Sequence, residues 1–280
     1  MNLFRNASGL KPLKDKHKVN LQVERLDERL VPTVTATMNV DTGVLIVNGD
    51  GGDNNIKIER AGPSGLVRVL ADGQYVNVLM SRGPARRNVN PNAIEISGNG
   101  GNDTLWTDGI GGSWLDITMS GGRGDDLLSV ARANYHESML IGGTGNDILV
   151  GGRSTDHLNG NAGRDILIGG RGADFLYGGT GQDFLMPAYT DFDLDMRALR
   201  QIRDYWARTD LNYNQRVNGL LNSTAGYTGR RVNDSTVHTD SHRDEMFGDA
   251  DRDRFYSDFS QDDVRDTGGT RERLTDIWRP

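Results

Sequence analysis

The sequence has no cysteine, only 7 glutamates beside 32 aspartates, and an aromatic content of 7%. Without cysteine the chain has no disulfide bonds, no thiolate catalysis and no zinc site with cysteine ligands. It also has no apolar run near the ~18 residues that cross a bilayer, so no membrane span is expected. The net charge of −7 disfavours a nucleic acid as partner.

Glycine and aspartate are abundant instead, with 37 glycines in 280 residues. Glutamate favours helix interiors, whereas aspartate favours turns and helix caps. Glycine also favours turns, because it adopts backbone conformations that other residues avoid. The composition therefore favours a turn-rich or cation-binding structure over a large α/β enzyme.

The first 32 residues are interpreted as an N-terminal leader or targeting segment. They lack the apolar core and the small-residue cleavage site of a standard secretory signal. Leucine and valine recur every three or four residues over 21–32, with charges of both signs between them, which predicts a short amphipathic helix ending at Pro32. The same Glu/Arg-rich stretch resembles the LEPR-XLL-like leader of some bacterial extracellular proteins.

From residue 33 to residue 97 the hydrophobic period is two. Short runs rich in valine, isoleucine and leucine alternate with turns of glycine, asparagine and aspartate. Runs of this kind predict β-strands. We therefore expect a β-rich lead-in region over 33–97.

A nine-residue repeat is the strongest feature of the sequence. Every copy has aspartate at position 6 and leucine at position 8, and most have glycine at positions 1, 2 and 4. Seven copies share this phase, and the last five follow one another without a gap. They span residues 98–106, 121–129, 142–150, 151–159, 160–168, 169–177 and 178–186.

The repeat predicts half a solenoid coil per copy. Its glycines let six residues turn tightly with carbonyls facing inward, and position 8 supplies a buried leucine on a very short strand. Two copies complete one right-handed coil. The expected fold class is all-β, a parallel β-roll over 98–186. An irregular β region precedes the roll, and a cap of helices and degenerate repeats follows it at 187–280.

Stacked coils place the position-6 aspartates in two columns, one along each edge of the roll. The two earliest copies join a column if the segments 107–120 and 130–141 each act as a longer half-coil. The columns hold, in order, Asp103, Asp126, Asp147, Asp165 and Asp183 on one edge, and Asp156 and Asp174 on the other.

Such columns predict a bound cation. Carboxylates ~4.8 Å apart in adjacent coils repel by ~3–4 kcal/mol at an effective dielectric constant of ~20. One buried leucine contributes only ~1.5–3 kcal/mol, so the array is expected to be largely unfolded without a counter-charge. A hard cation held by two carboxylates and several turn carbonyls supplies that charge. Oxygen ligands in a flexible geometry favour Ca²⁺ over Mg²⁺.

The pattern GGxGxDxUx resembles the RTX (repeats-in-toxin) nonapeptide over residues 98–106 and 121–186. The resemblance implies a calcium-binding β-roll whose ligands are the position-6 aspartates and the turn carbonyls. We expect two looser sites along the part of the first column that contains Asp103 and Asp126. The firm sites expected are Asp147 with Asp165, Asp165 with Asp183, and Asp156 with Asp174.

These features indicate an extracellular calcium-binding protein, secreted or at the cell surface. Its repeats are expected to stay unfolded at cytosolic calcium and to fold on Ca²⁺ binding after export. Calcium ions are the expected partners, with cell-surface or matrix contacts as a further option. Two other functions stay open, a secreted hydrolase with RTX repeats as an accessory and a calcium-dependent adhesion or matrix protein.

Some positions depart from the pattern. Ser154 replaces glycine at position 4 and weakens the case for the second column, whereas Asn99 and Asn161 at position 2 tolerate a left-handed backbone. Residues 49–56 form a degenerate copy with asparagine at position 6, interpreted as a hairpin turn rather than a calcium site. Residues 248–255 form another, interpreted as a capping remnant.

Helices are expected after the repeats. Thr190 or Asp191 can cap a helix that continues to Trp206, and a second helix is expected over about 212–221. We expect this pair to cover the apolar end of the solenoid. The three aspartates between 191 and 195 are interpreted as partners of the helix dipole rather than as a metal cluster.

No catalytic constellation stands out, so the chain is not expected to be an enzyme. His136 and Glu137 begin like a zincin motif, but the second histidine is missing, and neither a nucleophile elbow nor a Walker loop occurs. His238 and His242 lie four residues apart among aspartates. They are interpreted as surface polar residues rather than metal ligands.

Overall fold

The computed structural model describes residues 34–62, 66–111, 115–133, 137–223, 226–257, 261–265 and 275–276. The chain divides into two units, Met1–Val31 and Pro32–Pro280, and every described residue belongs to the second. The amphipathic helix predicted over 21–32 therefore lies outside the described residues. Within the described part, no helix has both the length and the apolar character needed to cross a membrane.

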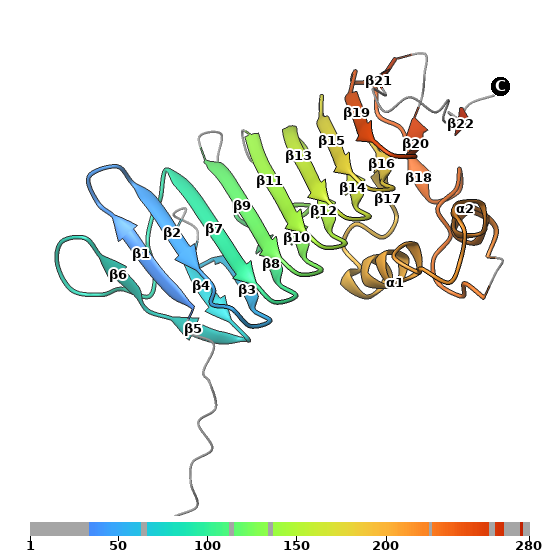
Figure 1. Cartoon of the computed structure of the whole chain (residues 1–280). Helices are drawn as coiled ribbons and strands as arrows, with labels where there is room; N and C mark the ends of the chain where they lie inside the picture. The colour runs from blue at the N-terminus through green and yellow to red at the C-terminus, as the bar shows by residue number, and fades with distance from the viewer. Residues whose placement is uncertain are drawn as a thin grey trace, which may run out of the picture. The chain divides into compact units, whose positions relative to one another are not determined.

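Two ten-stranded sheets make up most of the fold, and the strands of the repeat region run parallel (Figure 1). The first sheet contains, in spatial order, β21 (Asp263–Arg265), β19 (Glu245–Ala250), β15 (Phe175–Thr180), β13 (Thr155–Ala162), β11 (Glu137–Thr144), β9 (Asp116–Arg123), β7 (Ala93–Gly100), β2 (Val44–Asn48), β1 (Thr35–Asn39) and β6 (Val78–Met80). The second contains β22 (Thr275–Asp276), β20 (Arg254–Ser257), β16 (Phe184–Met186), β14 (Ile166–Ile168), β12 (Ile148–Val150), β10 (Leu127–Ser129), β8 (Thr104–Asp108), β3 (Asn55–Arg60), β4 (Val67–Ala71) and β5 (Gln74–Val76).

Successive strands of the repeat region alternate between the two sheets. β12 and β14 pair in parallel in the second sheet, and β13, which lies between them in sequence, pairs with β11 and β15 in the first. Each copy thus supplies one turn and one strand, and two copies complete a coil. The predicted parallel β-roll is confirmed.

The core lies between the inner faces of the two sheets. The position-8 leucines stack there because one coil contributes one leucine to each sheet, and parallel pairing keeps them in register, as with Leu149 and Leu167. All seven are buried: Leu105, Leu128, Leu149, Leu158, Leu167, Leu176 and Leu185. The longer half-coils also hold the register, because Leu105 pairs with Leu128 and Leu128 with Leu149.

The parallel stacking begins before the first repeat copy. β2 pairs with β7 and β3 pairs with β8, both in parallel, so residues 49–54 connect strands of different sheets. The hairpin interpretation of this segment is wrong, because it forms a roll turn with Asn54 at the aspartate position. In the first sheet, β1 pairs antiparallel with β2 and parallel with the last strand, β6, whereas the antiparallel strands β4 and β5 end the second sheet.

The stacking also continues after the last repeat copy. β19 pairs in parallel with β15, and β20 with β16. The sequence of 239–265 keeps the nine-residue phase although its glycines are mostly lost. Position 6 is Asp244, Asp253 and Asp262, and position 8 is Met246, Phe255 and Val264. The degenerate copy at 248–255 is therefore one of three, and the roll extends beyond 98–186 at both ends.

Residues 187–238 form an insertion between two coils. The short strands β17 (Tyr189–Thr190) and β18 (Val237–His238) pair antiparallel and hold its two ends together. Between them lie helix α1 (Met196–Trp206) and helix α2 (Tyr213–Asn222). Helix α2 matches the one predicted over about 212–221, and Asn212 caps it through a reciprocal pair of hydrogen bonds with Gln215.

The N-cap of α1 is Asp195, so the predicted start at Thr190 or Asp191 is wrong. The Asp195 carboxylate accepts hydrogen bonds from the backbone N–H groups of Arg197 and Ala198. Thr190 does not cap the helix, because its backbone N–H and its hydroxyl both donate to the carboxylate of Asp193. Because this hydrogen-bonded turn comes first, the helix begins about one helical turn later than predicted.

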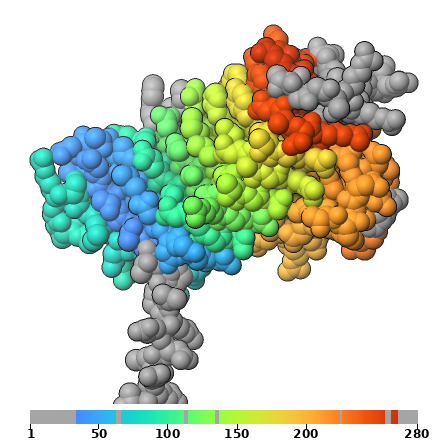
Figure 2. Space-filling model, viewed as in Figure 1, coloured from blue at the N-terminus to red at the C-terminus, as the bar shows by residue number. Residues whose placement is uncertain are grey.

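The two helices cover the outer face of the second sheet rather than the end of the solenoid. Leu199, Ile202 and Trp206 of α1 pack with Ile148 and Phe184, which point away from the roll interior. Figure 2 shows this segment in orange against the yellow and green coils. The expected end cap is therefore corrected to a side cover. The reason lies in the copies whose strands form the second sheet, since their apolar residues at positions 7 and 9 point to the outer face and are buried there by the helices.

Candidate metal centre

Position-6 aspartates form a continuous hydrogen-bond ladder along the first edge of the roll. The backbone N–H of each donates to Oδ1 of the aspartate one coil further on. The N···O distances are 2.7 Å from Asp103 to Asp126, 2.8 Å from Asp126 to Asp147, 2.8 Å from Asp147 to Asp165 and 2.9 Å from Asp165 to Asp183. All five predicted aspartates of this column are thus brought together in the predicted order.

The first ladder continues past the predicted residues at both ends. Asn54 donates its N–H to Asp103 over 2.7 Å, and Asp183 donates to Asp253 over 2.8 Å. Asp253 lies 70 residues from Asp183 in sequence, beyond the helical insertion. The sequence identifies both turns as degenerate copies but predicts other roles for them, because Asn54 lacks the charge and the turn before Asp253 lacks glycine at positions 2 and 4.

The second edge has the same arrangement. Asp156 donates its N–H to Asp174 over 2.9 Å, and Asp174 donates to Asp244 over 2.7 Å. Ser154 does not break this column, because its carbonyl faces Gly172 of the next coil as a glycine carbonyl would. Asp156 differs from the others in one respect, since its Oδ2 also accepts the N–H of Gly152 at 2.6 Å.

The second carboxylate oxygen of most of these aspartates is buried and has no hydrogen-bond partner. Oδ1 is used by the ladder, whereas Oδ2 faces the interior of the turn. This holds for Asp103, Asp126, Asp147, Asp165, Asp174 and Asp183, each no more than 1% exposed. A buried carboxylate oxygen without a donor is costly, so the site is suited to a cation.

Glycine at position 1 makes room for this oxygen. A Cβ built on Gly160 would lie 2.4 Å from Oδ2 of Asp165 and 2.7 Å from the carbonyl oxygen of Gly178 in the next coil. Both distances are too short for a real side chain. The aspartate oxygen of one coil and a carbonyl oxygen of its neighbour therefore face the same glycine.

Backbone carbonyls of positions 2 and 4 add further oxygens to the edge. Gly163 at position 4 has a φ of 142°, and a Cβ there would lie only 1.6 Å from the carbonyl oxygen of Gly145. Gly143 at position 2 faces the carbonyl of Gly122 in the same way. The turns thus present carboxylate and carbonyl oxygens together between adjacent coils.

Burial raises the pKa of all seven predicted aspartates. The pKa of Asp165 rises to about 9, first through burial and then through the charges of Asp183 and Asp147. The pKa of Asp147 rises to about 8 and that of Asp103 to about 6, in both cases mainly through burial. Without a cation, the folded columns hold protons that the unfolded chain releases.

A second ladder at position 5 was not predicted. The N–H of Asp125 donates to Oδ1 of Asn102, and the N–H of Asn146 donates to Oδ1 of Asp125, at 2.8 and 2.7 Å. It runs opposite to the aspartate ladder, since each N–H here donates to the preceding coil. The available signal was the recurrence of asparagine or aspartate at position 5 of these copies.

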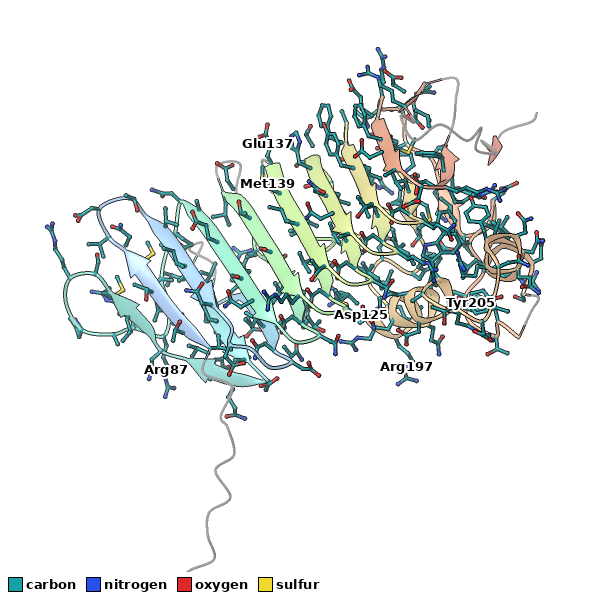
Figure 3. The ribbon with its side chains drawn as sticks, in the orientation of Figure 1. Arg87, Asp125, Glu137, Met139, Arg197 and Tyr205 are labelled. Atoms are coloured by element: carbon teal, nitrogen blue, oxygen red, sulfur yellow. The ribbon has the colours of Figure 1, made fainter. Side chains whose placement is uncertain are left out.

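Helix α1 contacts the turns of the first column. Arg203 donates to the carbonyl oxygen of Asp125 over 2.8 Å, and the indole N–H of Trp206 donates to that of Gln182 over 2.7 Å. Figure 3 shows Asp125 at the turn edge beside this helix. The side cover is therefore bonded to the turns that carry the aspartates.

The other polar groups singled out in the sequence do not assemble into a metal site. His238 pairs with Asp191 over 2.6 Å, and His242 with Asp240 over 3.0 Å, both near the surface. His136 lies outside the described residues. Among those described, no group of three or more histidine, aspartate or glutamate side chains is placed to hold a metal ion.

The donor set of the columns fits Ca²⁺. It consists of two carboxylates from adjacent coils and several backbone carbonyls, without nitrogen or sulfur, which are the ligands that calcium prefers. The residues that would hold the ions are the column aspartates with the turns before them. Their role as ligands stays a prediction from the residues and the fit.

A family comparison agrees with this chemistry. Residues 95–109, 139–167 and 150–185 match the model of the RTX calcium-binding nonapeptide repeat. The chain thus carries an array of RTX calcium-binding repeats, and a calcium-binding role follows for it. The comparison does not address the LEPR-XLL-like segment. No curated protein and no solved structure matches the chain.

Proposed function

We propose that the protein is an extracellular calcium-dependent structural module. The strands of its two described ten-stranded sheets form one roll whose two edges bind Ca²⁺, and the roll folds when the ions bind. The ions act as cross-links between coils, in the role that disulfides have in many secreted proteins and that this cysteine-free chain cannot fill.

The observation that carries this proposal is the divided use of each carboxylate. Oδ1 of Asp165 accepts the neighbouring N–H, and Oδ2 is buried without a donor. In a metal-free roll this pattern repeats coil after coil and accumulates buried charge. Binding free energy of the cation then becomes folding free energy, because the turn that binds it does not exist in the unfolded chain.

Export as an unfolded chain fits the same energetics. Calcium sites of extracellular modules typically have dissociation constants of ~10⁻⁴–10⁻³ M, far above cytosolic calcium. A chain whose fold depends on such sites stays unfolded inside the cell and folds outside it. Chain expressed inside cells, where free calcium is low, should therefore be soluble and should lack the far-UV circular dichroism signal of a β-roll.

We also propose that the module has no catalytic activity of its own. The support for this is that the buried aspartates are used by the ladders and that the described His–Asp pairs lie near the surface. Assays for proteolysis, lipolysis and glycoside hydrolysis on the calcium-loaded full chain test it. Reproducible turnover that disappears with a histidine variant such as His238→Ala would overturn it.

Circular dichroism tests the folding proposal. The full chain is dialysed against EGTA, and the β signal is followed as free Ca²⁺ is raised to several millimolar, with Mg²⁺ as the control cation. We expect cooperative gain of β structure with Ca²⁺ and little with Mg²⁺. A chain that keeps its full β signal and melting temperature in EGTA would contradict the proposal.

A further inference from the structure

We propose a calcium site between the coil of Asp183 and the coil of Asp253, which cross-links two segments separated by the helical insertion. This inference rests on the proposed calcium binding and extends it to residues outside the family match, which ends at residue 185. Figure 1 shows β19 and β20 lying beside β15 and β16, so the two coils are adjacent.

The geometry of the step repeats that of the steps inside the array. Asp183 donates its N–H to Oδ1 of Asp253 over 2.8 Å, while its own Oδ2 is fully buried and has no hydrogen-bond partner. A Cβ on Gly178 would lie 2.6 Å from this Oδ2 and 3.0 Å from the carbonyl oxygen of Gly248. Oxygens from both coils therefore face one glycine, as they do at Gly160.

The turn before Asp253 keeps the backbone shape of a repeat turn without the glycines at positions 2 and 4. Asp249 at position 2 has a φ of 67°, and Asp251 at position 4 has a φ of 77°. Left-handed backbone costs energy for a non-glycine residue. Asn161 occupies the same conformation at position 2 of another copy, with a φ of 71° and no charge. The C-terminal turn thus accepts the same backbone cost and adds two carboxylates.

Those carboxylates belong to the turn that faces the buried Oδ2 of Asp183. Asp249 and Asp251 follow Gly248, whose carbonyl oxygen faces Gly178 together with that Oδ2, so the turn adds negative charge to the neighbouring coil. Carboxylate charge around a calcium site increases its affinity. We therefore expect this site to bind Ca²⁺ more tightly than the copies whose positions 2 and 4 are uncharged.

The site also closes a long loop. Asp183 and Asp253 are separated by 70 residues that include α1 and α2. A metal cross-link restrains more chain entropy when it closes a longer loop. An ion here would hold the C-terminal coil on the roll and fix the helices between two coils.

Native mass spectrometry and hydrogen exchange of the full chain test the site. The variant Asp253→Asn keeps the shape and the Oδ1 acceptor but removes the charge. We expect it to bind one Ca²⁺ ion fewer than the natural sequence and to lose calcium-dependent protection in β19 and β20. A full ion count with unchanged protection would overturn the inference.

A second variant covers the case in which Asp253→Asn fails to fold. Asp249→Gly with Asp251→Gly restores the repeat glycines, relieves the backbone and removes both extra charges. We expect half-saturation of the site between Asp183 and Asp253 to need about three- to tenfold more free Ca²⁺ in this variant, although its backbone is relaxed. Asn161→Gly is the matched control, since it relieves the same conformation without a charge change, and it should leave calcium affinity unchanged.

These outcomes separate the two proposals. If the natural sequence binds no Ca²⁺, the proposed function fails. If it binds Ca²⁺ but Asp253→Asn keeps the full ion count and the double glycine variant binds every ion as tightly, only the C-terminal site fails. A purely structural role for Asp249 and Asp251 predicts unchanged affinity in the double glycine variant.

Discussion

The backbone N–H of Asp147 donates a 2.8 Å hydrogen bond to Oδ1 of Asp165, whose other oxygen is buried without a donor. The first bond sets the spacing of adjacent coils. The second oxygen is left for a group that carries positive charge. One side chain thus links the architecture of the roll to its ion chemistry, and this link gives the following predictions.

Substitution of a column aspartate should act in opposite directions with and without calcium. Asp165→Asn removes a buried charge, so we expect an equal or larger residual β signal in EGTA. It also removes a ligand shared by two sites, so ~tenfold more Ca²⁺ should be needed for folding. Circular dichroism in EGTA and along a calcium titration measures the two effects. The exposed Asp41→Asn is the control and should move neither.

Position 1 should not tolerate a methyl group. Gly160→Ala places a Cβ 2.4 Å from Oδ2 of Asp165, and we expect a loss of about 1–3 kcal/mol in unfolding free energy in Ca²⁺. Gly51→Ala is the matched control, because a Cβ there has no heavy atom within 4 Å. Chemical denaturation compares the two, and equal stability of both variants would count against the described turn.

The metal-free roll should lose stability as the pH rises. Asp147 and Asp165 have folded-state pKa values raised by burial to about 8 and about 9, above those of the unfolded chain. Their contribution is fully present below the unfolded pKa and is lost as the pH rises through the folded values. In EGTA we therefore expect less residual β signal in circular dichroism at pH 9 than at pH 6.5, a range that stays above the isoelectric point of about 5.3.

Calcium should reverse that trend, because protons and Ca²⁺ compete for the same carboxylates. Less free Ca²⁺ should be needed for folding at pH 9 than at pH 6.5. Calorimetric titration at both pH values measures this requirement and the protons released. Identical calcium requirements with no proton release would contradict the assignment of the ions to these aspartates.

The helical cover should contribute to stability through its buried face. Leu199 is 1% exposed in the cluster between α1 and the second sheet, so Leu199→Ala should cost about 2–5 kcal/mol. Leu194 is 52% exposed, and Leu194→Ala should cost little. Thermal unfolding in saturating Ca²⁺, followed by tryptophan fluorescence, distinguishes them, since Trp206 lies in the same cluster.

Strict periodicity made the centre of the roll predictable from sequence. Aspartate at position 6 and leucine at position 8 face fixed directions once the period is known, so Leu149, Leu167 and the columns follow directly. The ends of the roll were harder to identify. Asn54, Asp244 and Asp253 belong to the same columns, but Asn54 lacks the charge, and the turns before Asp244 and Asp253 lack the glycines at positions 2 and 4.

The place of the helices could not be obtained from their own sequence. The amphipathic pattern of α1 shows that one face is buried, but it does not show against what. The decisive signal lay in the repeats, where copies at 142–150 and 160–168 have apolar residues at positions 7 and 9, whereas the copy at 151–159 has histidine and asparagine. That difference marks which sheet is covered on its outer face.

The number of Ca²⁺ ions bound per chain tests the central claim most directly. Native mass spectrometry of the full chain, in calcium and after EGTA, gives the count and the identity of the metal. We expect at least three ions, held by Asp147, Asp165, Asp183, Asp156 and Asp174, and loss of ions when Asp165 is replaced by Asn. A folded chain that binds no calcium, or one that keeps every ion in Asp165→Asn, would contradict the claim.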